Sequence, residues 1–218
     1  NTSTDESNII TDFIKSLKDS LSRVGILYHN SEFGLSFNNQ ITNNLDEMIV
    51  GSTPYDDAPE TFKTIITKTL SSTPDIIVVI GFTPSLGQLI KSLREQSYRG
   101  MIVSNIGFST PSVINSAGES ANGVFFVDYE LPIRTNHFVT VDSLSQLKYN
   151  TKFNSISFLS YFTLKSINYA IEHNKSTKIR DIANFLNTPQ KINIDEIELS
   201  LNRNGDMLPN LSVKEFYR

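Results

Sequence analysis

The residues best suited to chemistry stand in the stretch RVGILYHNSEFGLSF at positions 23–37, directly after an apolar run. His29 and Glu32 could act together as a general acid and a general base, because both side chains exchange protons. Such a pair would still need a third group and a bound substrate. A solvent-facing polar loop explains the same two residues. The sequence leaves an α/β enzyme using His29 and Glu32 as an alternative, but we expect no catalytic residue in this chain.

The other histidines and a possible anion-binding loop give weaker signals. His137 and His173 lack the short spacing of metal ligands, so we expect no metal site. The stretch GFTPSLG at 81–87 could bind an anion at a helix N-terminus. It fits equally well a simple helix start, with Thr83 as the N-cap and Pro84 in the first turn. No nucleotide-binding or serine-nucleophile motif occurs in the sequence, and we expect no cofactor.

Composition excludes several classes of function. The 218 residues carry a net charge of −4, and the basic residues are scattered, which argues against a nucleic-acid partner. The absence of cysteine excludes disulfides, thiol catalysis and cysteine-ligated zinc. No apolar run approaches the roughly 20 residues of a membrane span. The chain begins NTSTDES without an initiator methionine, from which we expect a processed or excised chain.

The order of apolar runs predicts an α/β fold over the first 130 residues. Runs rich in valine and isoleucine, continuous rather than alternating, are typical of parallel strands covered on both faces. Segments of helical period separate them, so we expect a Rossmann-like layered lobe with a central, mostly parallel sheet. We predict strands at 24–28, 48–55, 73–81, 100–105 and 123–130, and helices at 9–21, 35–48, 58–72, 85–97 and 110–118.

After residue 130 the pattern changes. We predict one irregular helix, then a long helix at 155–174 whose apolar residues surround most of its surface, and a helix at 177–188 with Thr177 as its N-cap. The final segment, 197–216, reads as a C-terminal hairpin of two strands around an Asn-Gly turn. NRNGD at 202–206 lacks the carboxylate spacing of a calcium loop, so we interpret it as a turn.

Several stretches, taken in order, resemble one family. RVGILYHNSEFGLSF, TPDIIVVIGFTPSLGQLIKSLREQ, GMIVSN and SAGESANGVFFVDYELP resemble type I periplasmic solute-binding proteins, nearest to the leucine/isoleucine/valine-binding proteins of ABC importers. The closing LNRNGDMLPNLSVKEF is similar to that branch's D-x-x-G-D hairpin, with Asn202 in place of the first aspartate. The late helix matches in order, although its usual YDA reads YFT at 161–163.

This resemblance implies a domain organisation. Family members have two α/β lobes that close on a small solute. Residues 1–130 would be the second lobe, residues 131–195 a helical segment that normally packs on the first lobe, and residues 196–218 a hairpin returning towards the second lobe. Since most of the first lobe would be missing, we expect a fragment. Its helices 155–174 and 177–188 should then fold back or form a homodimer with another copy.

The resemblance also implies ligand-binding residues. Phe33 stands where amino-acid binders often have tyrosine, and Phe82 and Thr83 would face the cleft. The segment after MIVS often presents an acidic residue to the ligand's ammonium, but this chain has Ser104, Asn105 and Ile106 there. We therefore expect Asn105 in the site and a less charged or more apolar solute, or a lobe that has lost binding. Ordinary packing would explain Phe33 and Phe82 equally well.

The leading hypothesis is a binding module and not an enzyme. We expect an extracytoplasmic or periplasmic protein, with a lipoprotein form of the full-length protein left open, that delivers an amino acid or related small molecule to an ABC permease. The alternative is a sensing or regulatory receptor domain of the same fold without a transport role. The sequence names neither the solute nor the permease.

Overall fold

The structure is a computed structural model that describes residues 3–17, 20–130, 135–150, 153–206 and 210–218. Its contacts divide the chain into two compact units, residues 2–128 with 211–218, and residues 129–210. Each unit has its own hydrophobic core. The first unit is an α/β lobe built on a mostly parallel sheet, which confirms the fold class expected from the apolar runs.

The sheet of the α/β unit has six strands in the order β2-β1-β3-β4-β5-β8. The first five strands are parallel to one another, and all five side chains of β3 are buried. Burial on both faces accounts for the continuous run of isoleucine and valine in that strand. The strands are β1 (Val24–His29), β2 (Ile49–Tyr55), β3 (Ile76–Ile80), β4 (Met101–Ser104), β5 (Val124–Tyr129) and β8 (Leu211–Glu215).

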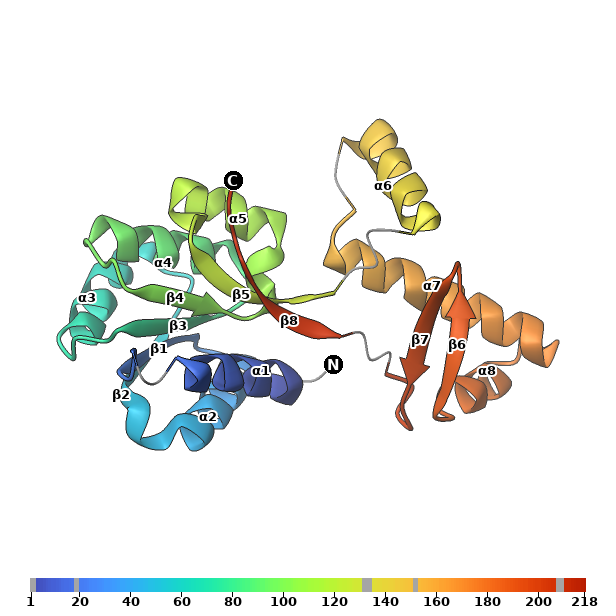
Figure 1. Ribbon diagram of the computed structural model, residues 1–218, viewed down its shortest axis with the longest axis horizontal. Coiled ribbons are helices and arrows are strands. Elements are labelled where there is room, and N and C mark those ends of the chain that lie inside the picture. The colour runs from blue at the N-terminus through green and yellow to red at the C-terminus, as the bar shows by residue number, and fades with distance from the viewer. Residues whose placement is uncertain (1–2, 18–19, 131–134, 151–152, 207–209) are drawn as a thin grey trace. The chain divides into compact units, whose positions relative to one another are not determined.

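Helices cover both faces of this sheet (Figure 1). One core joins α1 and α2 to the sheet through residues such as Ile10, Phe37 and Ile41. The other core joins α3, α4 and α5 to the opposite face through residues such as Phe62 and Leu89. These helices are α1 (Ser3–Ser16), α2 (Glu32–Leu45), α3 (Pro59–Leu70), α4 (Pro84–Glu95) and α5 (Pro111–Ala117), with short 3-10 turns at Asp46–Met48, Ile106–Ser109 and Gly118–Ala121.

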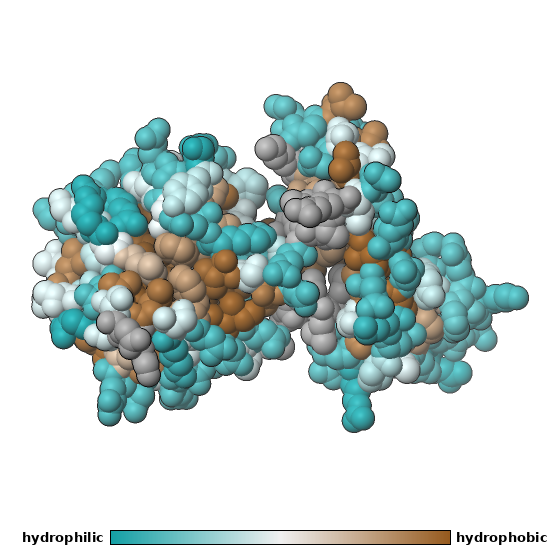
Figure 2. All heavy atoms as spheres, in the orientation of Figure 1, coloured by the Kyte–Doolittle hydropathy of each residue, from teal (hydrophilic) through white to brown (hydrophobic). Residues whose placement is uncertain are grey.

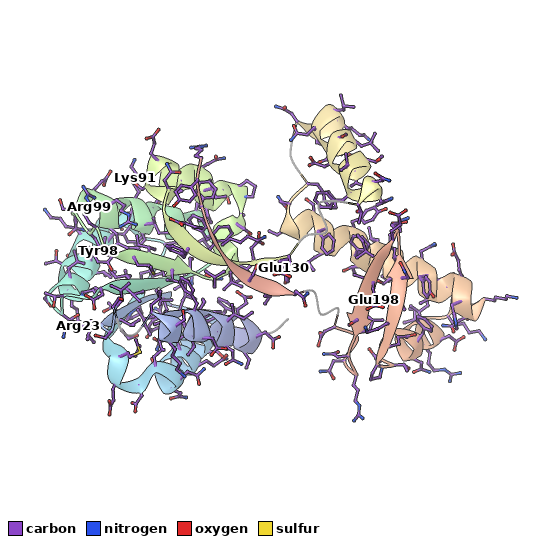
Figure 3. All side chains as sticks on the ribbon, in the orientation of Figure 1. Arg23, Lys91, Tyr98, Arg99, Glu130 and Glu198 are labelled. Atoms are coloured by element: carbon purple, nitrogen blue, oxygen red, sulfur yellow. The ribbon has the colours of Figure 1, made fainter. Side chains whose placement is uncertain are left out.

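The surface of this unit follows from the same layering. Figure 2 shows apolar side chains gathered in a band across the middle of the unit, with polar side chains on either side of the band. Figure 3 shows Arg23, Tyr98 and Arg99 at the amino-terminal ends of the strands. The Tyr98 hydroxyl donates to the Asp75 carbonyl at 2.9 Å, and the Asp75 carboxylate accepts from the Arg23 N–H at 3.1 Å. Polar contacts among protein groups therefore occupy this edge of the sheet.

The second unit packs a long helix against a two-stranded hairpin. Phe158 and Phe162 on α7 are buried with Ile192 and Leu199 of the hairpin. On its exposed side the hairpin carries an ion pair between Lys191 and Glu198 at 2.7 Å. Figure 3 labels Glu198 on this hairpin. The elements are α6 (Asn136–Tyr149), α7 (Ser155–Asn174), α8 (Ile179–Leu186), β6 (Gln190–Ile194) and β7 (Ile197–Leu201).

Most predicted elements lie where the sequence placed them, and α7 has the predicted bounds. The first helix begins at Ser3 instead of residue 9 and ends at Ser16, and residues 18–19 of the prediction lie outside the described residues. The last helix begins at Ile179, and its N-cap is Lys178, so the prediction of Thr177 as N-cap is wrong.

The predicted C-terminal hairpin at 197–216 is wrong in its pairing. The turn exists, because Gly205 has a φ of +75° and its N–H donates to the Asn202 carbonyl at 3.1 Å. The strand before the turn, however, pairs antiparallel with β6 and forms the hairpin 190–201. The strand after it, β8, joins the large sheet beside β5, where the Phe216 N–H donates to the Val124 carbonyl at 2.9 Å. An edge strand left bare on β5 would expose its backbone groups, and β8 pairs with them.

Gly34 illustrates a close approach that only glycine allows. It lies in the first turn of α2, where a Cβ atom would stand 2.0 Å from the His29 carbonyl oxygen. We predict that Gly34→Ala lowers the free energy of unfolding by about 2–3 kcal/mol, because a backbone oxygen cannot move aside easily. Urea unfolding of the 218-residue chain measures this. The control Leu35→Ala, at a side chain that is 50% exposed, should change stability by about 0.5 kcal/mol or less. Equal losses in both variants would contradict the steric argument.

Candidate functional site

The strand order makes the carboxyl ends of β1 and β3 the first place to consider for a ligand. From β1 the chain passes through α2 to β2 on one side, while β3 pairs with β1 on the other side. The helices that follow β1 and β3 lie on opposite faces of the sheet, and the carboxyl ends of two such strands are the usual ligand position in open parallel sheets. The segments that follow these strands are residues 30–34 and 81–83.

Two phenylalanines meet at this point. The ring centroids of Phe33 and Phe82 lie 4.7 Å apart, and Phe82 is 47% exposed. Phe33 is half-buried at the start of α2, whose N-cap Ser31 accepts a hydrogen bond from the Gly34 N–H at 3.2 Å. The pair comes from different βα connections, so the fold itself brings together two residues that are 49 positions apart in the sequence. An aromatic pair in a partly open position can contact an apolar group of a ligand.

Thr83 occupies the N-cap position of α4, and Pro84 stands in the first turn, as the sequence predicted. The Thr83 side chain does not cap the helix, however, which corrects that part of the prediction. Its hydroxyl donates to the Asp57 carboxylate at 2.7 Å, and the Ser85 hydroxyl donates to the same oxygen. These hydrogen bonds from Ser85 and Thr83, with His29 nearby, hold the pKa of Asp57 below its ordinary value. Thr83 therefore fixes the loop after β2 to the start of α4.

His29 has a different partner from the one an enzyme would need. Its Nε2 lies 3.5 Å from the Asp57 carboxylate, and its ring packs edge-on against Tyr55 with centroids 5.5 Å apart. Within the described residues, no hydrogen bond or ion pair joins His29 to Glu32, which lies exposed in the first turn of α2. Asp57 joins both the histidine and Ser85, so the imidazole does not stand between carboxylate and hydroxyl as general-base activation of a serine requires.

Asn105 lies at the end of β4 and is completely buried. Its Oδ1 accepts a hydrogen bond from the Gly81 N–H at 3.0 Å, which ties the β4 loop to the β3 loop beside Phe82. Its Nδ2 has no partner within the described part of the chain. The preceding Ser104 is also fully buried and donates to the Val79 carbonyl at 2.7 Å. Of these two residues, Asn105 alone has an unused donor.

Sequence reasoning missed Glu6. This residue lies on α1 and is only 6% exposed, and its Oε2 accepts a hydrogen bond from the Ile106 N–H at 3.1 Å. Burial raises the pKa of Glu6 to about 7, although the Ile106 hydrogen bond acts in the opposite direction. A carboxylate thus stands at the segment 104–106, where the sequence shows none. The contact joins residues 100 positions apart, and no local pattern signals it.

A second polar cluster lies in the unit of residues 129–210, around the β6–β7 turn. The Asp195 carboxylate accepts from the Tyr161 hydroxyl at 2.9 Å and pairs with Lys165 at 3.1 Å and His137 at 3.3 Å. Burial acts to raise the pKa of Asp195, but the hydrogen bonds from Tyr161 and Lys165 hold it below its ordinary value. Asp195 has a φ of +52°, so these contacts stabilise a turn conformation that non-glycine residues rarely adopt.

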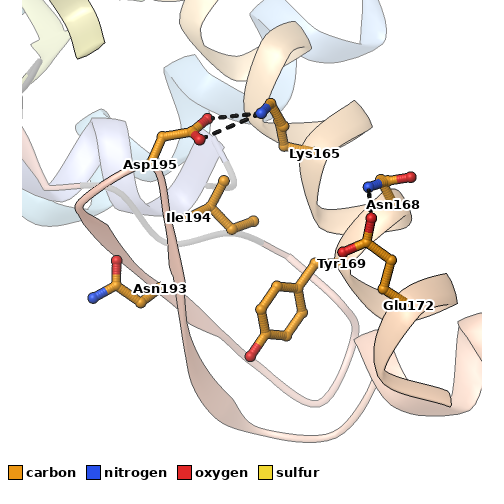
Figure 4. Close-up of a pocket in the computed structure, with 7 residues that line it drawn as sticks. All are labelled: Lys165, Asn168, Tyr169, Glu172, Asn193, Ile194 and Asp195. Carbon is orange, nitrogen blue, oxygen red and sulfur yellow. Dashed lines mark hydrogen bonds and ion pairs between the residues drawn. The ribbon is translucent and has the colours of Figure 1, made fainter.

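A shallow cavity of about 270 Å³ opens beside this turn. Figure 4 shows that it lies between α7 and the hairpin, with Lys165 bound to Asp195 at one end and Asn168 bound to Glu172 on the helix. Since the charged groups at the cavity are already paired with one another, the carboxyl edge of the large sheet remains the stronger candidate. His173 stands in the last turn of α7, where its ring packs against Phe185 with centroids 4.8 Å apart.

Two features are absent from the residues that the structure describes. No group of three or more histidine, aspartate or glutamate side chains among them could hold a metal ion. None of the helices in the same part of the chain combines the length and apolar character needed to cross a membrane.

Comparison with known proteins identifies the family. A family description, "Periplasmic binding protein", matches residues 1–138, which is more than half of the chain. The chain belongs to the periplasmic binding protein family. This confirms the resemblance seen in the motifs after β1, β3 and β4. A search of curated proteins gave no match.

Solved periplasmic binding proteins share the fold over almost the whole chain. A leucine-binding protein from Thermotoga maritima is 18% identical with a TM-score of 0.83, covering 97% of this chain and 62% of that one. An ABC-transporter solute-binding protein from Rhodopseudomonas palustris, in complex with 3,4-dihydroxybenzoic acid, is 14% identical with a TM-score of 0.81, over 98% and 61%. A branched-chain amino acid transporter protein from Streptococcus pneumoniae, in complex with isoleucine, is 17% identical with a TM-score of 0.72, over 96% and 64%. The chain thus spans about three-fifths of their length.

The buried Glu6 predicts a specific pH dependence for the stability of the α/β unit. Its pKa of about 7 lies above the ordinary 4.5, so the folded state holds the Glu6 proton more tightly than the unfolded state does. We predict that protonated Glu6 makes its full contribution to the free energy of unfolding below about pH 4.5. This contribution is lost as the pH rises through about 7. The loss should amount to about 3 kcal/mol or less.

Urea unfolding of the wild type and of Glu6→Gln across this pH range measures the effect. The difference between the two curves isolates Glu6, because all other groups titrate in both. Glu6→Gln should gain stability relative to the wild type as the pH rises, whereas Asp12→Asn, at an exposed position on the same helix, should run parallel to the wild type. Parallel curves for Glu6→Gln would contradict the assigned burial.

Proposed function

We propose that this chain is the solute-contacting lobe of a periplasmic binding protein that delivers a small molecule to an ABC permease. The observation that carries the proposal is the contact of Phe33 with Phe82 at the carboxyl edge of the parallel sheet. Thr83 and Asn105 hold the loops on which this pair stands, through Asp57 and the Gly81 N–H. The family and the bound solutes of two similar structures support this reading.

The proposal includes no chemical reaction. His29 and Glu32 lie on the same loop, but His29 is engaged by Asp57 and Tyr55. A protein that only binds a solute needs apolar rings beside buried polar groups, and this edge has both. We place the protein outside the cytoplasm, as its family name implies. A sensing or regulatory receptor domain of the same fold, without transport, remains the alternative reading.

Removing the aromatic pair tests solute binding. We predict that leucine, isoleucine or 3,4-dihydroxybenzoate at millimolar concentration raises the melting temperature of the 218-residue chain. Phe33→Ala and Phe82→Ala should each weaken binding about tenfold, because each removes an aromatic contact with the solute. Thermal shift measured over a series of solute concentrations gives the apparent Kd.

Leu35→Ala is the matched control, because Leu35 is a half-exposed apolar side chain on the same helix. Its apparent Kd should equal that of the wild type. If Phe33→Ala and Phe82→Ala bind as the wild type does, the site lies elsewhere. If no solute shifts the wild type, the sensing alternative gains support.

One face of α7 exposes apolar side chains to solvent. Ile156, Leu164 and Ile167 are 49%, 69% and 36% exposed and recur at helical spacing on one side of the helix. Phe158 and Phe162 lie on the other side, buried against the hairpin. The expected folding back of α7 is thus found on one face of the helix only, where it packs against the hairpin. We propose that a second copy of this chain covers the other face when no further lobe does so.

Light scattering of the 218-residue chain tests this pairing. We predict a concentration-dependent dimer that Leu164→Glu weakens at least tenfold, since a buried leucine contributes about 1.5–3 kcal/mol and a buried charge costs more. Leu147→Glu, on α6 at a side chain that is 85% exposed, should leave the dimer intact. A wild type that stays monomeric at high concentration would rule the pairing out.

A further inference from the structure

An open cavity of about 380 Å³ lies beside the C-terminus of α4 and is lined by Arg94, Arg99, Glu119, Ser120 and Asn122. Figure 3 labels Arg99 at this end of the α/β unit. We propose that the cavity binds a phosphate group through the two guanidinium groups. The inference goes beyond the proposed solute binding, because the 12 residues of α4, about 18 Å of helix, separate this cavity from the carboxyl edge of the sheet.

The turn after α4 fixes both arginine side chains in place. The Arg94 Nη1 donates to the Tyr98 carbonyl at 3.0 Å and to the Gly100 carbonyl at 2.9 Å. The Arg94 Cζ also lies 5.9 Å from the centroid of the Tyr98 ring. The Arg99 Nη1 donates to the Arg94 carbonyl at 3.1 Å. Both guanidinium groups are therefore held before a ligand arrives, which reduces the entropy that binding costs.

Neutral groups hold these two positive charges without compensating them. The hydrogen-bond acceptors of Arg94 and Arg99 are backbone carbonyls, and no ion pair among the described residues includes either arginine. Burial lowers the pKa of the half-buried Arg94, and the charge of Arg99 acts in the same direction. Lys91 on the same helix differs, because it pairs with Glu95 at 4.0 Å. An anion in the cavity would supply the missing opposite charge.

The donors around the cavity favour a phosphate group over a single carboxylate. Both side-chain hydrogen bonds of Arg94 leave through Nη1, so its Nε and Nη2 donate to none of the described residues. Asn122 accepts from the Arg218 N–H at 2.8 Å through Oδ1, which leaves its Nδ2 as a donor, and the Ser120 hydroxyl adds another. A phosphate group has more acceptor oxygens than a carboxylate has, and its geometry matches the planar fork of arginine.

Glu119 opposes this binding and so gives the test a second sign. Of the described residues that line the cavity, only Glu119 is acidic, and it forms an ion pair with neither arginine. Its exposed carboxylate repels an anion, and a neutral residue there would remove the repulsion. The whole chain carries a net charge of −4, so long-range attraction does not account for phosphate binding, and the local arginines must.

Arg99→Gln tests the cavity, because this side chain is exposed and its replacement leaves the contacts of Arg94 in place. Calorimetric titration of the 218-residue chain with pyrophosphate at low ionic strength gives Kd. We expect Arg99→Gln to weaken binding at least about fivefold and Glu119→Gln to strengthen it about twofold or more. The control Lys91→Gln removes a positive charge from the same helix outside the cavity lining and should bind as the wild type does.

A phosphate group can belong to a free compound or to a lipid headgroup, and vesicles separate these two sources. Sedimentation of the chain with phosphatidylglycerol vesicles, compared with phosphatidylcholine vesicles, measures binding to an anionic membrane surface. Vesicle binding that Arg99→Gln abolishes would assign the headgroup as the source. Pyrophosphate binding without vesicle binding would assign a free phosphate compound. Both results would support the cavity as a phosphate site.

Three results would overturn the proposal. Equal affinity for pyrophosphate in the wild type and Arg99→Gln is the first. The second is an equal loss of affinity in Arg99→Gln and Lys91→Gln, which would indicate diffuse charge in place of a site. The third is a wild type that binds neither pyrophosphate nor vesicles, or that binds vesicles alone and equally well after Arg99→Gln. None of these results bears on solute binding at the carboxyl edge, because the variants leave Phe33 and Phe82 unchanged.

Discussion

Burial of β3 on both faces is the constraint on which the α/β unit depends. All five side chains of Ile76–Ile80 are inaccessible to solvent, so helices must cover the sheet above and below. Polar groups are then confined to the strand ends. The amino-terminal end is occupied by contacts such as Tyr98 with Asp75, while the carboxyl end carries Phe82, Asn105 and the approach of Glu6. The position of the candidate site follows from the core.

The sequence could predict this architecture because its signals are local. A run such as TPDIIVVIG indicates a buried strand by composition alone, and the proline after Thr83 marks a helix start by its fixed φ. Phe33 and Phe82 could be named because each directly follows a strand, and the structure does place them in contact. Their role in binding remains a prediction, since a ring contact also occurs in ordinary packing.

Pairing partners were harder to predict, because they are not local. The Asn-Gly turn at 204–205 is present. However, β7 pairs with β6, the strand that precedes it in the sequence, and β8 joins the large sheet. The strict alternation in QKINIDEIELSL was the signal for the hairpin at 190–201, and the stronger turn signal obscured it. Glu6 lies beyond any such pattern. It precedes every strand of the sheet, and only the packing of α1 brings it to Ile106.

Glu6 also shows that a group at the carboxyl edge of the sheet need not maximise stability. A glutamine could accept the same hydrogen bond from the Ile106 N–H and would not lose stability on ionisation. A carboxylate at this depth costs folding free energy at neutral pH, since burial disfavours its charged form. The change in stability of the α/β unit between about pH 4.5 and about pH 7 would therefore depend largely on this single buried group.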